Sequence, residues 1–262
     1  MVDRGTQVHP TAIVADGARL GDGVVVGPYS IIGANVEIGD RTEIGPHVVV
    51  DGHTRIGARC RIVGQASIGT PPQDLKYAGG PTRLEMGDDN IVREFVTLNR
   101  ATEHGGGVTR IGNRCMFMAY AHVAHDCSIG DQVVMANAAT LAGHVTIEDF
   151  AIVGGLVAIH QFVRIGESVI LGGGAMVTLD VPPFCLAAGD RASLHGLNLV
   201  GLRRRGFSEE TIKGLRAAYR TLFQTGHKLR EALRLLREQT PAQPEVERLV
   251  SFIEASERGI CR

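Results

Sequence analysis

Apolar residues recur at every sixth position over most of the first 180 residues. From Val8 to Ile68 every sixth residue is aliphatic, the phase returns from Met86 to Leu98, and a run shifted by one residue extends from Ile111 to Val177. A period of six fits neither an α-helix nor a long alternating strand. It predicts very short strands joined by tight turns and stacked as a parallel β-helix.

The composition supports a mainly β protein of this kind. The chain has 34 glycines among 262 residues, 5% aromatic residues and no tryptophan. Glycine is nearly twice as frequent as in an average protein, which indicates tight turns around a core of small aliphatic side chains. Three hexapeptides make a triangular coil of 18 residues, and we expect this β-helix to occupy residues 1–190.

Two segments interrupt the period, at residues 70–85 (TPPQDLKYAGGPTRLE) and 99–110 (NRATEHGGGVTR). A regular solenoid does not need them, so we expect loops that carry function on a rigid scaffold; tolerated surface insertions are the alternative. From about residue 191 the pattern becomes helical, with Ser208 as an N-cap and further helical stretches at 227–238 and 244–258. Residues 191–262 are therefore expected to form a small C-terminal α-helical domain that caps the open end of the β-helix.

Charge and cysteine content exclude several classes of protein. Twenty-seven Lys and Arg against 28 Asp and Glu leave a net charge of −1, so no global field favours nucleic acid. The N-terminal MVDRGTQVHP has no apolar signal core, and no apolar run is long enough for a transmembrane segment. Five scattered cysteines are expected to be free thiols. We therefore expect a cytoplasmic protein.

The stretch YAHVAHDCS at residues 120–128 carries the most chemistry. With 18 residues in a coil, His125 lies in one column with Gly143 and Gln161, and coils stack about 4.8 Å apart. The neighbouring columns contain His144 and His160, and His122 precedes them on the first coil. None of these histidines occupies an apolar position of the repeat, so their side chains should point outward and gather on one corner.

Three interpretations of this cluster remain open. It is a set of scattered surface histidines, a metal site, or an acid–base site. His122, His125, Asp126 and Cys127 are all competent metal ligands, although we expect no metal. In the acid–base interpretation His125 accepts a proton, Asp126 orients the imidazole, and the backbone N–H of Gly143 faces a developing oxyanion.

Seven stretches carry a resemblance to a known family. VHPTAIV, QDLKYAG, AHVAHDC, NAATLAGHV, AIHQF, DVPPF and GLRRRGFS occur in an order and spacing similar to those of the UDP-N-acetylglucosamine 3-O-acyltransferases of lipid A biosynthesis. The resemblance covers essentially the whole chain. It implies a left-handed β-helix, a homotrimer with active sites between subunits, and the first step of lipid A biosynthesis: transfer of an (R)-3-hydroxyacyl group from acyl carrier protein to the sugar 3-hydroxyl.

The resemblance also implies roles for individual residues. His125 would be the general base, Asp126 its orienting group and Gly143 the oxyanion donor. The acyl donor would be acyl carrier protein with its phosphopantetheine arm, with no cofactor bound by the chain itself. The implied contacts to sugar and phosphate are Gln73, Asp74, Lys76, His122, His144, His160 and Gln161, and those near the nucleotide are Asn198, Arg204 and Arg205.

Some positions depart from the family or define its specificity. Arg191 and Val200 stand where well-known members have histidine and glutamate, which leaves the details of uracil recognition open. Gly173 matches a position where some members place a bulky residue that stops the acyl chain early, so we expect a longer acyl group than ten carbons.

A local basic excess suits an acidic carrier protein. From residue 203 to 238 the sequence has ten Lys and Arg against four Glu. A solvated helix face is the alternative explanation for most of these charges.

The sequence also fits several alternatives to this function. They are the later N-acyltransferase of the pathway, a zinc-dependent hexapeptide-repeat carbonic anhydrase, and a solenoid that only binds partners. The acceptor could carry a 3-amino group in place of the 3-hydroxyl, since His125 could serve either. Cys127 is expected to be structural.

Overall fold

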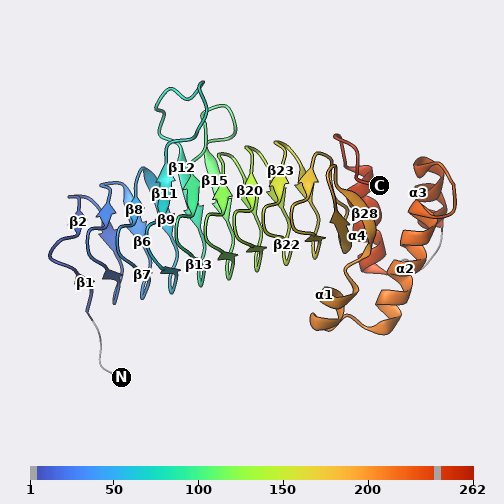
Figure 1. Ribbon diagram of the computed structural model, residues 1–262, viewed down its shortest axis with the longest axis horizontal. Coiled ribbons are helices and arrows are strands. Elements are labelled where there is room, and N and C mark those ends of the chain that lie inside the picture. The colour runs from blue at the N-terminus through green and yellow to red at the C-terminus, as the bar shows by residue number, and fades with distance from the viewer. Residues whose placement is uncertain (1–4, 239–242) are drawn as a thin grey trace.

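The computed structural model describes residues 5–238 and 243–262. This part of the chain is an elongated left-handed parallel β-helix with helices packed at its C-terminal end (Figure 1). The predicted fold class is confirmed. Residues 1–4, at the start of the N-terminal stretch discussed above, lie outside the described residues, as do four residues between the last two helices.

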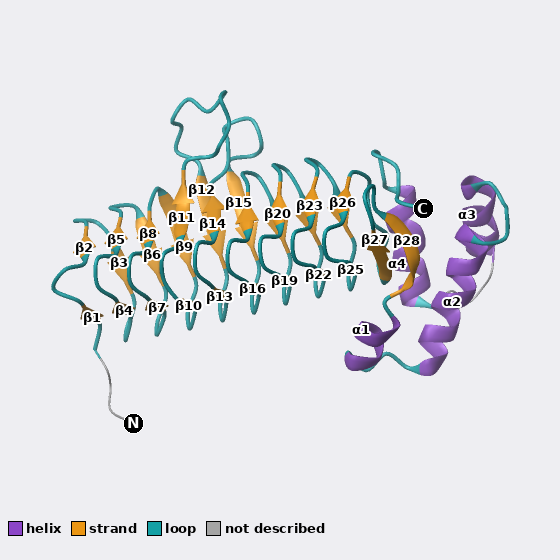
Figure 2. Cartoon of the chain, viewed as in Figure 1, coloured by secondary structure: helices purple, strands orange, loops and turns teal. Residues whose placement is uncertain are grey.

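Three sheets form the sides of the triangular coil, and most strands have two residues (Figure 2). Sheet A contains β1 (Gln7–Val8), β4 (Val25–Val26), β7 (Glu43–Ile44), β10 (Arg61–Ile62), β13 (Ile91–Val92), β16 (Met116–Phe117), β19 (Val134–Met135), β22 (Ile152–Val153), β25 (Ile170–Leu171), β27 (Cys185–Ala188) and β28 (Ser193–Leu197). Sheet B contains β2 (Ile13–Val14), β5 (Ile31–Ile32), β8 (Val49–Val50), β11 (Ser67–Thr70), β14 (Thr97–Asn99), β17 (His122–Val123), β20 (Thr140–Leu141), β23 (Ala158–Ile159) and β26 (Met176–Val177). Sheet C contains β3 (Arg19–Leu20), β6 (Val36–Ile38), β9 (His53–Ile56), β12 (Arg83–Met86), β15 (Val108–Ile111), β18 (Ser128–Ile129), β21 (Thr146–Ile147) and β24 (Arg164–Ile165).

The apolar residues that recur at every sixth position form the core of the β-helix. Successive coils pair in register, for example Val123 with Leu141 and Phe117 with Met135. The apolar residue of each short strand points inward, and Ile32, Leu141 and most of its equivalents are fully buried. Full burial of such a side chain contributes about 1.5–3 kcal/mol, so the stack gains a similar increment with every side of every coil.

The corners between sheets use a left-handed backbone. Asp126, His144 and Phe162 have φ values of 60°, 63° and 64° at equivalent corners of successive coils. The amide of His144 donates to the carbonyl of His125 at 3.0 Å, and the amide of Phe162 donates to the carbonyl of Gly143 at 3.2 Å. These bonds between coils offset the cost of the unusual conformation, which is about 1–3 kcal/mol for each residue.

Both loop excursions leave the β-helix at the corner between sheets B and C (Figure 1). They are shorter than predicted. Arg83–Met86 is strand β12, which pairs with β9 and β15, and Val108–Ile111 is β15 itself. The loops proper therefore run over residues 71–82 and 100–107, because the flanking residues continue the ladder of sheet C.

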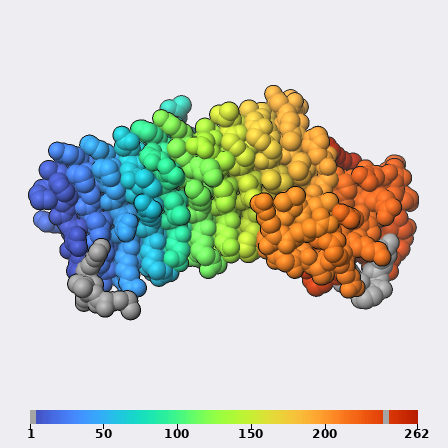
Figure 3. Space-filling view, turned by 60° about the horizontal axis from the view of Figure 1, so that its bottom comes forward, coloured from blue at the N-terminus to red at the C-terminus, as the bar shows by residue number. Residues whose placement is uncertain are grey.

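The C-terminal part contains α1 (Leu199–Arg204), α2 (Glu209–Phe223), α3 (Leu229–Glu238) and α4 (Pro244–Glu254). The predicted N-cap is confirmed, since Ser208 Oγ accepts a hydrogen bond from the amide of Thr211 at 3.0 Å. Buried residues of these helices pack with Phe184 at the end of the β-helix. In the space-filling view this part sits directly against the last coils (Figure 3).

Two features of the C-terminal part differ from the prediction. Residues 193–197 fall within the domain predicted to be helical but form β28, which pairs antiparallel with β27 and covers the last edge of sheet A; an uncovered strand edge would leave backbone groups unpaired. Helix α4 ends at Glu254 rather than near 258, because the following residues bond to the last coil through Asp180. No helix in the described residues is long and apolar enough to cross a membrane.

Strand β7 offers a test of the core. Ile44→Ala should lower the free energy of unfolding by about 2–5 kcal/mol, because Ile44 is 1% exposed and the coil cannot close over the cavity. Its neighbour Glu43 points outward, so Glu43→Ala is the matched control and should change stability little. Urea denaturation followed by circular dichroism measures both. Equal destabilisation by the two variants would contradict the inward and outward alternation.

Candidate active site

The corner between sheets B and C brings the predicted histidines together. His125 and Asp126 follow β17, Gly143 and His144 follow β20, and Gln161 follows β23. The strands before them are in register, with His122 opposite Thr140 and Thr140 opposite Ala158. We call residues 125–126, 143–144 and 160–162 the histidine corner.

His125 and Asp126 form a hydrogen-bonded dyad at the centre of this corner. His125 Nδ1 lies 2.8 Å from Asp126 Oδ2, and the Asp126 side chain is fully buried whereas that of His125 is 14% exposed. An ionised carboxylate only accepts hydrogen bonds, so Nδ1 carries the proton. Nε2 of His125 is therefore the unprotonated nitrogen and is able to accept a proton from a substrate.

The second loop holds the Asp126 carboxylate through Thr102, a residue that no sequence pattern indicated. Thr102 donates to Asp126 Oδ2 from its hydroxyl at 2.7 Å and from its amide at 3.1 Å. The Asp126 amide donates to the Thr109 hydroxyl at 2.8 Å. The placement of the 99–110 interruption directly beside the histidine corner could have pointed to these contacts, since polar residues of a loop there face the same corner.

Two glycines allow the close packing around the dyad. A side-chain carbon on Gly105 would lie 2.1 Å from Asp126 Cγ, and one on Gly143 would lie 2.4 Å from His125 Cε1. The loop backbone thus rests directly on the carboxylate, and the coil above rests directly on the imidazole. Within residues 5–238 and 243–262, no group accepts a hydrogen bond from the Gly143 amide, which leaves this N–H available to another acceptor.

A pocket of about 660 Å³ opens over the dyad. Both loops contribute to it. Asp74 Oδ1 accepts a hydrogen bond from the Lys76 amide at 2.9 Å, which shapes the first loop. The pocket is lined by Gln73, Asp74, Lys76, Thr102, His104, His125, His144, Gln161 and Phe162. Five predicted contact residues therefore meet at the dyad in a single chain, together with His104, which the sequence analysis did not select.

Burial shifts two histidines beside the dyad. His144 stacks on Phe162 with ring centroids 4.4 Å apart, and its Nε2 lies 3.8 Å from Asp126 Oδ2. Burial lowers the pKa of His144, an effect that Asp126 opposes. Burial, and then the neighbouring His125, lowers the pKa of His122, whose Nδ1 lies 2.6 Å from the Thr97 hydroxyl. Both rings are thus kept neutral to lower pH than an exposed histidine.

The metal interpretation finds only part of its ligand set at the corner. His125, Asp126 and His144 offer ligand atoms within 4.8 Å of one another. Cys127, however, points into the core, where its thiol donates to the carbonyl of Ala142 at 3.3 Å and burial raises its pKa to about 12. Asp126 Oδ2 already accepts bonds from Thr102 and His125. The donor set therefore favours acid–base chemistry.

Four other predicted residues lie elsewhere in the single chain. Asn198 caps helix α1 and donates to the carbonyl of Ser168, and Arg205 lies 3.4 Å above the Phe150 ring and bonds to Glu167 at 3.1 Å. Both belong to the corner between sheets C and A, with Arg204 next to them. Gly173 lies at the corner between sheets A and B, where a side-chain carbon would lie 3.3 Å from the carbonyl of Gly155.

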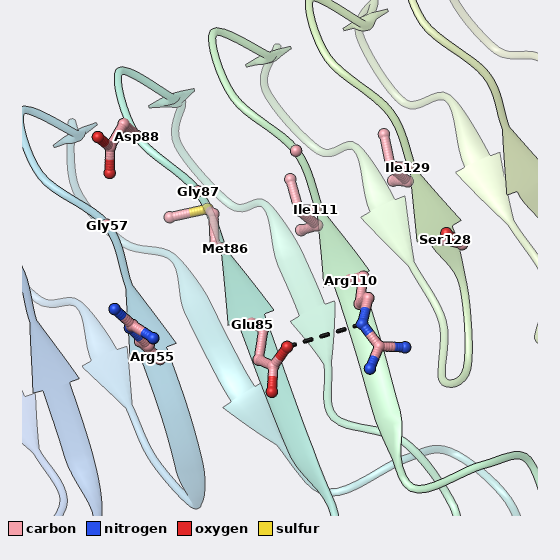
Figure 4. Close-up of a pocket in the computed structure, with 11 residues that line it drawn as sticks. Arg55, Gly57, Glu85, Met86, Gly87, Asp88, Arg110, Ile111, Ser128 and Ile129 are labelled. Carbon is pink, nitrogen blue, oxygen red and sulfur yellow. Dashed lines mark ion pairs between the residues drawn. The ribbon is translucent and has the colours of Figure 1, made fainter.

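A second hollow, of about 390 Å³, lies on the outer face of sheet C (Figure 4). Charged side chains alternate along it, and Glu85 approaches Arg110 at 3.7 Å. Its lining residues include no histidine or other neutral base near pH 7. The arrangement resembles a ladder of exposed ion pairs rather than a reaction site, and we place the chemistry at the histidine corner.

The neutral His122 makes stability depend on pH. Its pKa in the folded chain is below the unfolded value near 6.5, so the unfolded chain binds the proton first as pH falls. The free energy of unfolding should decrease from about pH 6.5 downward until the folded-state pKa is passed. His122→Asn keeps a polar atom near the Thr97 hydroxyl but removes the titration. Urea midpoints at pH 7.5 and 5.5 should therefore differ less for this variant than for the native chain, and an equal difference would contradict the shift.

Known proteins share this architecture over nearly the full chain. A family described as "Udp N-acetylglucosamine O-acyltransferase; Domain 2" matches residues 180–261, and the bacterial transferase hexapeptide repeat matches residues 17–52 and 109–143. The acyl-[acyl-carrier-protein]–UDP-N-acetylglucosamine O-acyltransferase of Alkalilimnicola ehrlichii is 53% identical over 98% of this chain and 100% of its own length. That of Thermodesulfovibrio yellowstonii is 53% identical over 98% and 99%.

Solved structures agree with these relatives. The UDP-N-acetylglucosamine O-acyltransferase of Moraxella catarrhalis superposes with a TM-score of 0.94 at 42% identity, covering 97% of this chain and 99% of that one. The Arabidopsis UDP-N-acetylglucosamine acyltransferase gives a TM-score of 0.86 at 36% identity, covering 97% and 100%. The chain therefore belongs to the acyl-[acyl-carrier-protein]–UDP-N-acetylglucosamine O-acyltransferase family.

Proposed function

We propose that this chain transfers an (R)-3-hydroxyacyl group from acyl carrier protein to the 3-hydroxyl of UDP-N-acetylglucosamine, the first step of lipid A biosynthesis. The observation that carries this function is the His125–Asp126 dyad at the floor of a pocket that also contains Lys76 and His144. The dyad supplies the base that the reaction requires, and the family relationship supplies the substrates. The N-acyltransferase and carbonic anhydrase alternatives have no such support.

The geometry suggests how the dyad acts. Nε2 of His125 removes the proton of the 3-hydroxyl as its oxygen attacks the thioester carbonyl, and Asp126 stabilises the imidazolium that forms. A tetrahedral intermediate results, whose oxyanion would be bound by the unpartnered amide of Gly143. When this intermediate collapses, the carbon–sulfur bond breaks, and the imidazolium returns its proton to the departing thiolate. His125 is then neutral again, so no cofactor of the chain's own is needed.

Charges near the pocket suit an anionic acceptor. Lys76 provides a cation in the first loop, and His144 and Gln161 provide polar atoms on successive coils of the same corner. We assign these groups, with Gln73, Asp74, His122 and His160, to the sugar and the diphosphate. The acyl carrier protein would approach the basic excess of residues 203–238. Its phosphopantetheine arm could then extend into the pocket.

A homotrimer would complete the site. Asn198, Arg204 and Gly173 lie on the two corners of the coil that do not carry the dyad, so one chain alone does not bring them to the pocket. The corner between sheets A and B exposes stacked Phe95 and Tyr120, and Leu156 is 68% exposed further along it. Exposed apolar ladders of this kind suit contact with another subunit, and such contact would place Gly173 beside a neighbour's histidine corner.

Val200 is 64% exposed and Arg191 is also exposed. Recognition of the uracil would therefore use groups other than the histidine and glutamate that well-known members have at these two positions. All five cysteines are free and buried, which suits the reducing cytoplasm.

The function predicts the effect of removing the base. With (R)-3-hydroxymyristoyl acyl carrier protein as donor and chelator present, mass spectrometry should detect acylated UDP-N-acetylglucosamine. His125→Ala should lower the rate by about 100- to 10,000-fold, the usual contribution of a general base. His53, an exposed histidine on sheet C, provides the matched control, and His53→Ala should retain the native rate. The proposed function would be refuted if the native chain formed no product with this donor, with shorter donors or with the 3-amino sugar.

Acyl-chain length provides a separate prediction. Gly173 has no side chain, and a side-chain carbon there would already lie close to the Gly155 carbonyl. If the acyl chain passes this corner, Gly173→Met should shift the preference toward shorter donors by about tenfold or more, since a blocked methylene cannot be accommodated without strain. A series of acyl carrier protein donors of ten to sixteen carbons measures kcat/KM for both chains. An unchanged preference would remove Gly173 from the acyl site.

A further inference from the structure

The last eight residues of the chain are bonded to the final coils beside the histidine corner. Asp180 is buried, and its carboxylate accepts hydrogen bonds from the Arg164 amide at 2.8 Å and the Ser256 hydroxyl at 2.7 Å. Its backbone pairs with the tail, with bonds from the Asp180 amide to the Gly259 carbonyl and from the Cys261 amide to the Asp180 carbonyl. The tail is therefore held at a defined position relative to the coils below it.

Arg258 lies within this tail and reaches the histidine corner. Its Nε donates to the carbonyl of Thr178 at 2.8 Å, and its Nη2 lies 2.7 Å from Nδ1 of His160. Thr178 lies one coil above His160, so the guanidinium bridges the coil edge and the imidazole. Arg258 and His160 are 98 positions apart in the sequence, and the fold alone brings them together.

The contact decides which nitrogen of His160 carries the proton. A guanidinium has five donors and no acceptor, so Nδ1 must accept from Arg258, and the proton of the neutral ring lies on Nε2. The carbonyl of Gln161 is 3.1 Å from the same Nδ1, a contact that would require the opposite tautomer. Both cannot hold at once, and the shorter bond, which has a charged donor, is the stronger.

We propose that Arg258 is a positioning residue for UDP-N-acetylglucosamine: it fixes His160 as the tautomer that donates from Nε2 to an oxygen of the bound substrate. A ring that is free to exchange tautomers would present a donor only part of the time. The guanidinium also adds a positive charge next to that donor, which suits an anionic acceptor such as a nucleoside diphosphate. This inference rests on the proposed function for its kinetic consequence, but the tautomer itself does not.

A purely structural role in anchoring the tail is the competing explanation, and Arg164 provides the comparison. Its Nη1 donates to the Ala255 carbonyl at 3.1 Å, and its guanidinium lies 4.4 Å above the Phe252 ring. Arg164 thus holds the same tail without contacting His160. A substitution of Arg164 should therefore loosen the tail without removing the hydrogen bond between Arg258 and His160.

A double-mutant cycle separates the two explanations. Arg258→Met should lower kcat/KM for UDP-N-acetylglucosamine by about tenfold, and His160→Ala should lower it at least as much. If Arg258 acts through His160, the double variant should be no slower than His160→Ala alone, and Arg258→Lys should recover part of the loss. Arg164→Met is the control, and its effect should multiply with that of His160→Ala. Multiplying effects of Arg258→Met and His160→Ala, or no effect of Arg258→Met, would overturn the proposal.

A measurement on the resting protein does not depend on activity. In protein labelled with ¹⁵N-histidine at about pH 8, where an ordinary imidazole is neutral, the ring shifts of His160, assigned by their loss in His160→Ala, should show a protonated Nε2 and a bare Nδ1. Arg258→Met should populate both tautomers. A protonated Nδ1 in the native chain would overturn the proposal even if the enzyme is active. An inactive native chain with the expected tautomer would instead refute the proposed function.

Discussion

The structure depends on the hydrogen bonds that join each corner to the corner one coil below. At most turns a residue in the left-handed conformation donates its amide to a carbonyl of the preceding coil, as Phe150 does to Asp131 at 2.8 Å and Leu156 to Asn137 at 2.9 Å. These bonds, with the strand ladders, keep the coils in one register. Because the register is constant, side chains 18 residues apart become neighbours.

Constant register is what turns a sequence column into a chemical site. His125, Gly143 and Gln161 would be unrelated residues in any other fold, but here they share one corner on successive coils. The inward residues form the hydrophobic core, and the outward residues take no part in it. A catalytic group can therefore be placed on the outer surface without a cost to the core, and its position is as well defined as that of the backbone beneath it.

The loops convert this rigid surface into a pocket. Both leave the β-helix at the corner that carries the dyad, and the second returns to place Thr102 on the Asp126 carboxylate. A buried carboxylate requires donors, and the loop adds the amide and hydroxyl of Thr102 to the hydrogen bond from His125. The C-terminal part adds a further layer at the other side of the same corner, through the tail that contacts His160.

Several features were within reach of the sequence because they repeat or are local. The period of six predicted the β-helix, its inward residues and the corner on which the histidines gather, and the Ser208 cap followed from residue type and position alone. A repeat determines its own register, since each coil needs only its neighbour as a template. The family resemblance then named the reaction, and the relatives agree with it.

Contacts between non-repeating segments were decided by the tertiary structure alone. Thr102 lies 24 residues from Asp126 and Arg258 lies 98 residues from His160, and no period links either pair. The ends of the loops, the strand β28 and the short α4 likewise depended on which backbone groups remained to be paired. The sequence by itself determined the scaffold and the column that contains His125, Gly143 and Gln161, because those follow from local repetition. The partners that orient Asp126 and His160 required the folded chain, because their positions are set by where excursions and termini meet the coils.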